Sequence, residues 1–149
     1  MNHTRIFLFA LLLASITFGC SAKSEPTKEQ LISDLKSVYE LLSDGDYDGA
    51  AEYFKGPEGM PKAMLAKELR GILEKRELSM EGIEVLDRKG KFGTLSEIFP
   101  DHAEGWMARN KLSPDAECYA ISYEGAEVAA HWTGDRFELI RLDDVGKIK

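Results

Sequence analysis

The stretch that most constrains the fold is residues 117–142, where three runs rich in β-branched and aromatic residues are separated by two short turns. The turns are Glu124-Gly125 and Gly134-Asp135. Two-residue turns that contain glycine, set between alternating apolar residues, are a strong local signal for β-hairpins. The stretch therefore predicts an antiparallel meander of three strands.

The two turns also predict which residues share a face of this meander, because successive side chains of a strand point to opposite faces. The register places Tyr123 opposite Ala126 and Thr133 opposite Arg136. One face then consists of Tyr119, Ile121, Tyr123, Val128, Ala130, Trp132, Phe137 and Leu139. A face this apolar needs a covering layer, which the helical patterns of residues 27–110 can supply.

The same register places a thiol, an imidazole and a carboxylate in one row on the opposite face. Cys118 lies opposite His131, and His131 lies opposite Glu138, with roughly 5 Å between opposed Cβ atoms. Such a row suits a nucleophile, a base and an orienting acid. It equally suits a structural hydrogen-bonded row, because a buried lone cysteine is usually inert. The neighbours on this face, Ala120, Ala129, Ile140 and Leu142, predict that helices partly cover it.

The N-terminus has the pattern of an export signal. A basic start is followed by an apolar run over residues 6–18 that is short for a membrane span. The small Gly19 before Cys20 resembles a bacterial lipoprotein signal, which implies removal of residues 1–19 and lipid attachment to Cys20. Acyl chains would then anchor the protein to a membrane. The alternative is an ordinary cut after Ala22, which would yield a secreted or periplasmic soluble protein.

Residues 20–26 predict a short tether, and residues 27–149 predict a single domain. Without residues 1–19, which hold one basic residue and no acidic one, the net charge is −8. An acidic domain of this kind is repelled by phosphate backbones, so nucleic acid is excluded as a partner. Either cleavage site takes Cys20 out of reach of a disulfide, which leaves Cys118 as a lone thiol.

The segment before the meander predicts a series of helices. Thr27 and Gln30 have capping-box spacing, and apolar residues then recur with helical period to about Ser43. Further helices are predicted over residues 47–54, 62–76, 79–90, 92–99 and 101–110, by the positions of caps, glycines and prolines. The fold class is therefore α+β, with N-terminal helices packed on a C-terminal three-stranded antiparallel meander.

Residues 40–54, with the sequence ELLSDGDYDGAAEYF, form a helical hairpin pattern with a Gly-Asp-Tyr turn. This run resembles the N-terminal hairpin of small lipoproteins in the NTF2-like superfamily. The resemblance implies a reduced NTF2-like fold, with helices packed in the concave side of a curved sheet around a conical pocket. Members of that superfamily include enzymes, ligand binders and interaction modules, so the fold does not decide the function. No catalytic residue of the superfamily is carried over to this sequence.

Asp44, Asp46 and Asp48 match the first half of a calcium-binding loop between two helices. The twelfth loop position is Lys55, where calcium loops need a bidentate glutamate. Asp46 as a helix N-cap and Asp48 in the first helical turn explain the same acids without a metal. The sequence contains no glycine-rich phosphate loop and no nucleophile elbow, so it predicts no cofactor.

Together these patterns predict an exported, lipid-anchored protein of the cell envelope that acts as a non-catalytic binding module. Its partner would be a small apolar ligand, held in a pocket lined by Tyr119, Trp132 and Phe137, or another envelope protein. A sheet face sealed by helices would remove the small-ligand version. The alternative is an NTF2-like hydrolase or isomerase that uses His131 with Cys118 or Glu138.

Overall fold

The computed structural model describes residues 24–149, so the predicted signal segment 1–19, Cys20 and the alternative cut after Ala22 lie outside the described residues. The helices are α1 (Lys28–Ser43), α2 (Tyr47–Ala51), α3 (Lys62–Leu69), α4 (Met80–Lys89), α5 (Leu95–Ile98) and α6 (Ala103–Arg109). The strands are β1 (Lys91–Thr94), β2 (Cys118–Tyr123), β3 (Ala126–Trp132) and β4 (Phe137–Asp143), and a 3-10 turn, η1 (Val145–Lys147), follows them. The protein is α+β, with N-terminal helices packed on a C-terminal four-stranded antiparallel sheet.

The predicted meander is confirmed as strands β2, β3 and β4. Cys118 pairs with His131, Tyr123 with Ala126, and Trp132 with Phe137, as the turns require. At the first turn Glu124 and Gly125 both have positive φ, at 46° and 89°. A two-residue hairpin needs this backbone conformation because its twist then matches that of the strands.

The prediction of only three strands is wrong, because β1 adds a fourth strand beside β2. Residues 92–99 were expected to be helical, but Lys91–Thr94 pairs with β2, and only Leu95–Ile98 forms a helix. The ring of Phe92 stacks on that of Tyr119, with centroids 5.7 Å apart. The strand ends at Thr94, which forms a capping box with Glu97 at the start of α5.

A β-bulge changes the predicted register in the second half of β4. Ala130 pairs with Leu139 as expected, but Ala129 pairs with Arg141, so Ile140 is the extra residue. The prediction that Leu142 shares a face with Cys118 is therefore wrong. Leu142 instead packs on the main core, on the opposite face of the sheet.

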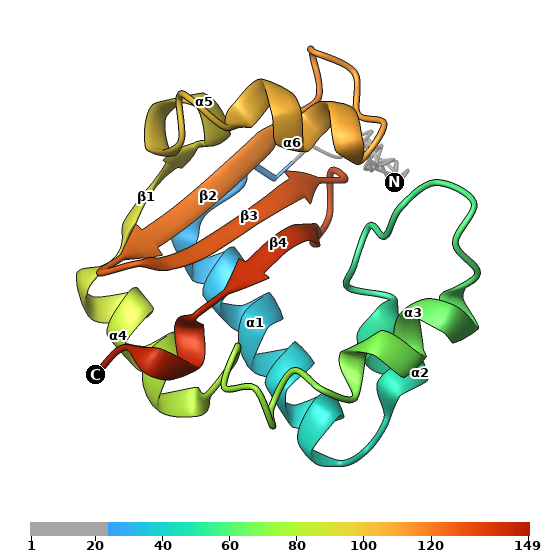
Figure 1. Ribbon diagram of the computed structural model, residues 1–149. Helices are drawn as coiled ribbons and strands as arrows, with labels where there is room; N and C mark the ends of the chain where they lie inside the picture. Colours follow the sequence, from blue (N-terminus) through green and yellow to red (C-terminus); the bar gives the residue numbers. More distant parts are fainter. Residues whose placement is uncertain (1–23) are drawn as a thin grey trace, which may run out of the picture.

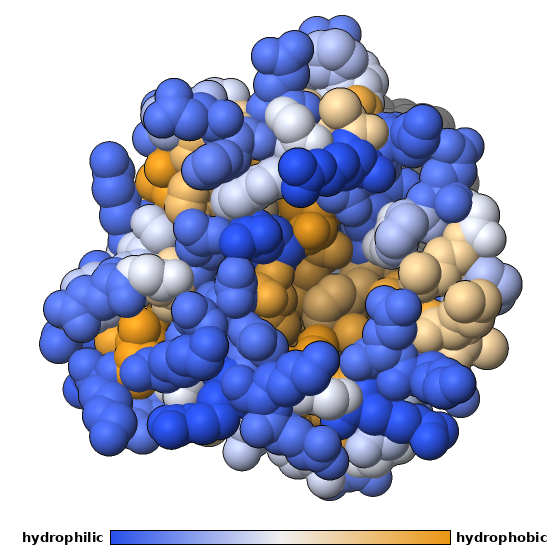
Figure 2. Space-filling view, in the orientation of Figure 1, coloured by the Kyte–Doolittle hydropathy of each residue, from blue (hydrophilic) through white to orange (hydrophobic). Residues whose placement is uncertain are grey.

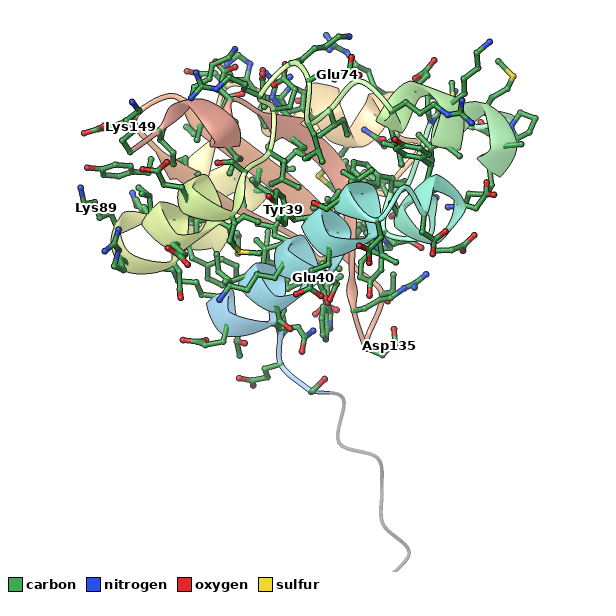
Figure 3. The ribbon with its side chains drawn as sticks, turned by 90° about the horizontal axis from the view of Figure 1, so that it is seen from below. Tyr39, Glu40, Glu74, Lys89, Asp135 and Lys149 are labelled. Carbon is green, nitrogen blue, oxygen red and sulfur yellow. The ribbon has the colours of Figure 1, made fainter. Side chains whose placement is uncertain are left out.

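Helices cover both faces of the sheet. The main core lies between the sheet and helices α1 to α4, and a second apolar cluster lies under α5 and α6. Figure 1 shows α1 behind the sheet, and Figure 3 shows α1 and α4 together on that side. The second cluster contains Cys118, Ala120 and Ala129 from the sheet, with Leu95 and Trp106 from the helices.

Most predicted helix starts are confirmed by their caps. The side chains of Thr27, Asp46 and Ser79 each accept a hydrogen bond from a backbone N–H three residues later. Three predicted helices are shorter than expected: α2 ends at Ala51, α6 spans Ala103–Arg109, and α3 ends at Leu69 and is followed by turns to residue 76. Gly71 lies two residues after the end of α3. Glycine in a helix interior lowers the stability of the helix by about 1 kcal/mol relative to alanine.

A buried carboxylate connects the first helix to the last strand. The Asp34 carboxylate accepts hydrogen bonds from the Phe137 backbone N–H at 3.0 Å and from the Gln30 side chain at 3.0 Å. Burial raises the pKa of Asp34, and these hydrogen bonds oppose the shift. The contact fixes the start of β4 against α1.

Candidate functional site

The row Cys118, His131 and Glu138 is present, because the three residues pair across β2, β3 and β4 as predicted. Within residues 24–149 no hydrogen bond joins His131 to either neighbour, and its buried Nδ1 atom has no partner. Cys118 is 6% exposed and lies in the apolar cluster under α5 and α6. The row thus lacks the hydrogen bonds by which a base activates a nucleophile.

Burial raises the pKa of the Cys118 thiol to about 11. At pH 8 only about one thiol in a thousand would be ionised, and the thiolate is the reactive form. We therefore expect the native protein not to react with an aromatic disulfide reagent at pH 8, and to react fully in guanidinium chloride. Fast reaction of the native protein would contradict the buried thiol and favour the enzyme alternative.

The three aromatic residues expected to line a pocket are packed against other side chains. Phe137 is 0% exposed and Trp132 is 4% exposed, and their ring centroids lie 4.8 Å apart. Tyr119 is half-buried and contacts Phe137 edge-on at 6.1 Å. Tyr119 borders a cleft of ≈ 220 Å³ together with Cys118, whereas neither Trp132 nor Phe137 lines any of the main clefts of residues 24–149. These rings fill the space between the sheet and α1.

The structure does not bring Asp44, Asp46 and Asp48 within ligand distance of one another. Asp46 caps α2 by accepting the Gly49 N–H at 2.9 Å. Over residues 24–149, the one group of three or more possible ligand residues within 4.8 Å is Glu77, Asp143 and Asp144. Glu77 accepts the Asp144 N–H at 3.0 Å, so this carboxylate holds the end of β4.

The structure also contains a cleft beside the edge strand β4 that the sequence did not predict. We call it the β4 cleft; its volume is ≈ 360 Å³. It is lined by Phe54, Gly56, Pro57, Leu65, Ile72, Arg109, Asn110, Leu139, Ile140, Arg141 and Leu142. Figure 2 shows apolar residues in a hollow at the centre of this face, bordered by hydrophilic ones. The size and the largely apolar lining are typical of binding clefts.

One wall of the cleft is the segment after α2, which pairs with β4 over a very short distance. The Leu139 N–H donates to the Tyr53 carbonyl at 2.7 Å, and the Lys55 N–H donates to the Leu139 carbonyl at 2.9 Å. The Lys62 ammonium holds this segment by donating to the carbonyls of Ala51 and Phe54, both at 3.0 Å. The chain then turns away at Gly56, whose φ is +67°.

Beyond this turn the edge of β4 is open. Residues of an antiparallel strand alternate between bonding to their neighbour and pointing away from it. The N–H and C=O of Leu139 bond to the segment after α2, so they point away from β3. Arg141 pairs with Ala129 and points its backbone groups toward β3. The N–H and C=O of Leu142, the next residue, therefore point to the open edge. Within the described chain, Leu142 makes no backbone hydrogen bond to a loop or turn. Its polar backbone groups therefore face the β4 cleft or solvent.

The second wall of the cleft comes from the end of α6 and carries the charged groups. Arg141 is engaged: its guanidinium contacts Glu127 at 2.6 Å and Asp143 at 2.8 Å, and lies 4.6 Å from the ring centroid of Trp106. Arg109 is exposed and makes no ion pair with any described residue. The cleft thus has an available cation on the α6 side.

Comparisons with known proteins do not classify this chain. No family model matches it, and no curated protein or solved structure is significantly similar to it. Residues 24–149 include no helix with the length and hydrophobicity to cross a bilayer. The resemblance of residues 40–54 to NTF2-like lipoproteins therefore stays a prediction.

Proposed function

We propose that this protein is an exported, membrane-anchored binding module without catalytic activity, and that its β4 cleft binds an extended segment of another envelope protein. The observation that carries the proposal is the edge of β4. It is paired through Leu139 and then left open at Leu142, beside an apolar cleft. An extended segment added to such an edge gains backbone hydrogen bonds and places alternate side chains in the cleft.

Two features favour a protein segment over a small apolar ligand. The predicted aromatic pocket is filled by its own rings, with Phe137 fully buried. The β4 cleft is lined by four consecutive residues of one strand, from Leu139 to Leu142. A small apolar ligand would cover the Leu142 N–H and C=O without bonding them, and unpaired buried polar groups are costly.

The membrane anchor in this proposal is a lipid on Cys20, followed by a short tether that leads to α1. Intact mass of the protein purified from its native membrane tests this part. We expect a mass that lacks residues 1–19 and includes acyl chains. A mass that begins at Lys23 without lipid would support a secreted or periplasmic protein instead, and it would leave the binding proposal in place.

The binding proposal is tested by selecting twelve-residue peptides from a random display library against the full chain in phosphatidylcholine nanodiscs. We expect selected peptides to shift the backbone amide signals of Leu142 and Gly56 in NMR spectra. Failure to select any peptide, or shifts confined to the far faces of α1 and α4, would contradict the proposal.

A pair of substitutions at one position tests the hydrogen bonding itself. Leu142→Pro removes the N–H that points to the open edge, where proline is tolerated in a strand. Leu142→Ala removes similar apolar contacts and keeps the N–H. We expect Leu142→Pro to bind selected peptides about tenfold more weakly than Leu142→Ala, the equivalent of one hydrogen bond. Equal affinities in two variants with native circular dichroism would contradict strand addition.

A further inference from the structure

Charge is unevenly distributed along the described chain, and one wall of the β4 cleft comes from a segment with a small excess of basic residues. Residues 55–77 contain six basic and four acidic residues, whereas the other described residues contain eleven basic and twenty-two acidic ones. This basic segment supplies the cleft wall formed by Gly56, Pro57, Leu65 and Ile72. A ligand with negative charge is therefore repelled by most of this protein and less so at the cleft.

The two sides of the cleft differ in chemistry. On the side of the main core, an added strand would meet Phe54, Leu65 and Ile72, which are apolar. On the other side it would meet the end of α6, where Arg109 is exposed and makes no ion pair within residues 24–149. Arg141 on that side is already paired with Glu127 and Asp143.

A strand presents successive side chains to opposite sides. A segment lying along the edge of β4 would therefore place every second side chain against the apolar wall and the others toward Arg109. Resting on the proposed function, we infer that the partner is a protein segment in which apolar residues alternate with acidic ones. Arg109 favours the acidic side chains of the partner segment, and the apolar wall favours its apolar side chains.

The test uses three eight-residue peptides that alternate valine with glutamate, glutamine or lysine, each flanked by Gly-Ser. Their dissociation constants are measured on the full chain in phosphatidylcholine nanodiscs, at low and high salt. We expect the glutamate peptide to bind about tenfold more tightly than the glutamine peptide at low salt, and the lysine peptide to bind most weakly. High salt should reduce this difference because exposed charges are screened.

Arg109→Gln and a matched control separate local recognition from overall charge. Arg109→Gln should abolish most of the preference for the glutamate peptide over the glutamine peptide. The control is Arg88→Gln, which removes an exposed arginine from the last turn of α4 and should leave the preference intact. Equal loss in both variants would attribute the preference to net charge and overturn the inference.

The remaining outcomes distinguish this inference from the proposed function. If all three peptides bind equally and shift the Leu142 amide, strand addition stands and acidic selection is overturned. If no peptide binds, the proposed function fails as well.

Displacement of the peptides by decanoate at equal concentration would assign the cleft to an anionic amphiphile. A dimer that is lost in Leu142→Pro would assign it to a second copy of this chain, and either result overturns the inference.

Discussion

Replacing Gly82 with alanine should lower the free energy of unfolding by about 3 kcal/mol, at the upper end of overpacking effects. Gly82 lies in α4 against η1, and a Cβ atom built there would be 1.7 Å from the Val145 carbonyl oxygen. The backbone of α4 packs directly on the backbone of η1 at this point. A Cβ atom can therefore be accommodated only if α4 or η1 moves as a whole. Urea denaturation followed by circular dichroism measures the loss.

Gly105→Ala is the matched control for this substitution. Gly105 lies on the exposed side of α6, and a Cβ atom there would meet nothing within 4 Å. The change should stabilise the protein by up to about 1 kcal/mol, since alanine is the better helix former. A loss at Gly105 comparable to that at Gly82 would show that neither effect comes from the contact with Val145.

Phe137→Ala should lower the free energy of unfolding by about 4 kcal/mol, because it empties a site in the middle of the core. The Phe137 side chain is 0% exposed and contacts the rings of Trp132 and Tyr119. The backbone hydrogen bond to Asp34 is retained in this variant, so the change isolates the ring. Thermal and urea unfolding measure it.

The comparison for Phe137→Ala is Met64→Ala, since the Met64 side chain is 56% exposed. That surface change should alter the free energy of unfolding by less than about 0.5 kcal/mol. A similarly small effect at Phe137 would mean that its ring faces open space. It would then favour the aromatic pocket expected from the sequence over the filled core seen in the structure.

The parts of the fold that were predictable are those fixed by short-range chemistry. The hairpin register follows from two turns with glycine, of which Glu124-Gly125 adopts positive φ at both residues. Helix starts follow from side chains that cap them, at Thr27, Asp46 and Ser79. Each of these signals acts within about four residues, so no knowledge of the tertiary structure is needed to interpret it.

The parts that were not predictable depend on contacts between distant segments. Strand β1 has the sequence KFGT, which lacks the alternation of a half-buried strand and is extended because it pairs with β2. The bulge at Ile140 has no local signal either, although it sends Leu142 to the main core. Such features are set by pairing partners, and tertiary context overrides local propensity.

The β4 cleft illustrates the same limit for the candidate site. Its walls come from four separate stretches of the chain, around Phe54, Leu65, Arg109 and Leu142. Apart from Phe54, which ends the run that resembles NTF2-like hairpins, these stretches belong to no motif, and packing alone brings them together. Of the residues singled out from the sequence for their chemistry, Cys118, Trp132 and Phe137 are buried, and Tyr119, His131 and Glu138 are half-buried.

The hydrogen bond between Asp34 and the Phe137 amide joins residues 103 positions apart. The first helix therefore cannot reach its final environment before almost the entire polypeptide has been synthesised. Contacts of such long range slow folding, since a large loop must close before they form. Under the export proposed above, a chain that cannot complete its fold before its last strand is made would stay unfolded long enough to pass through a translocation channel.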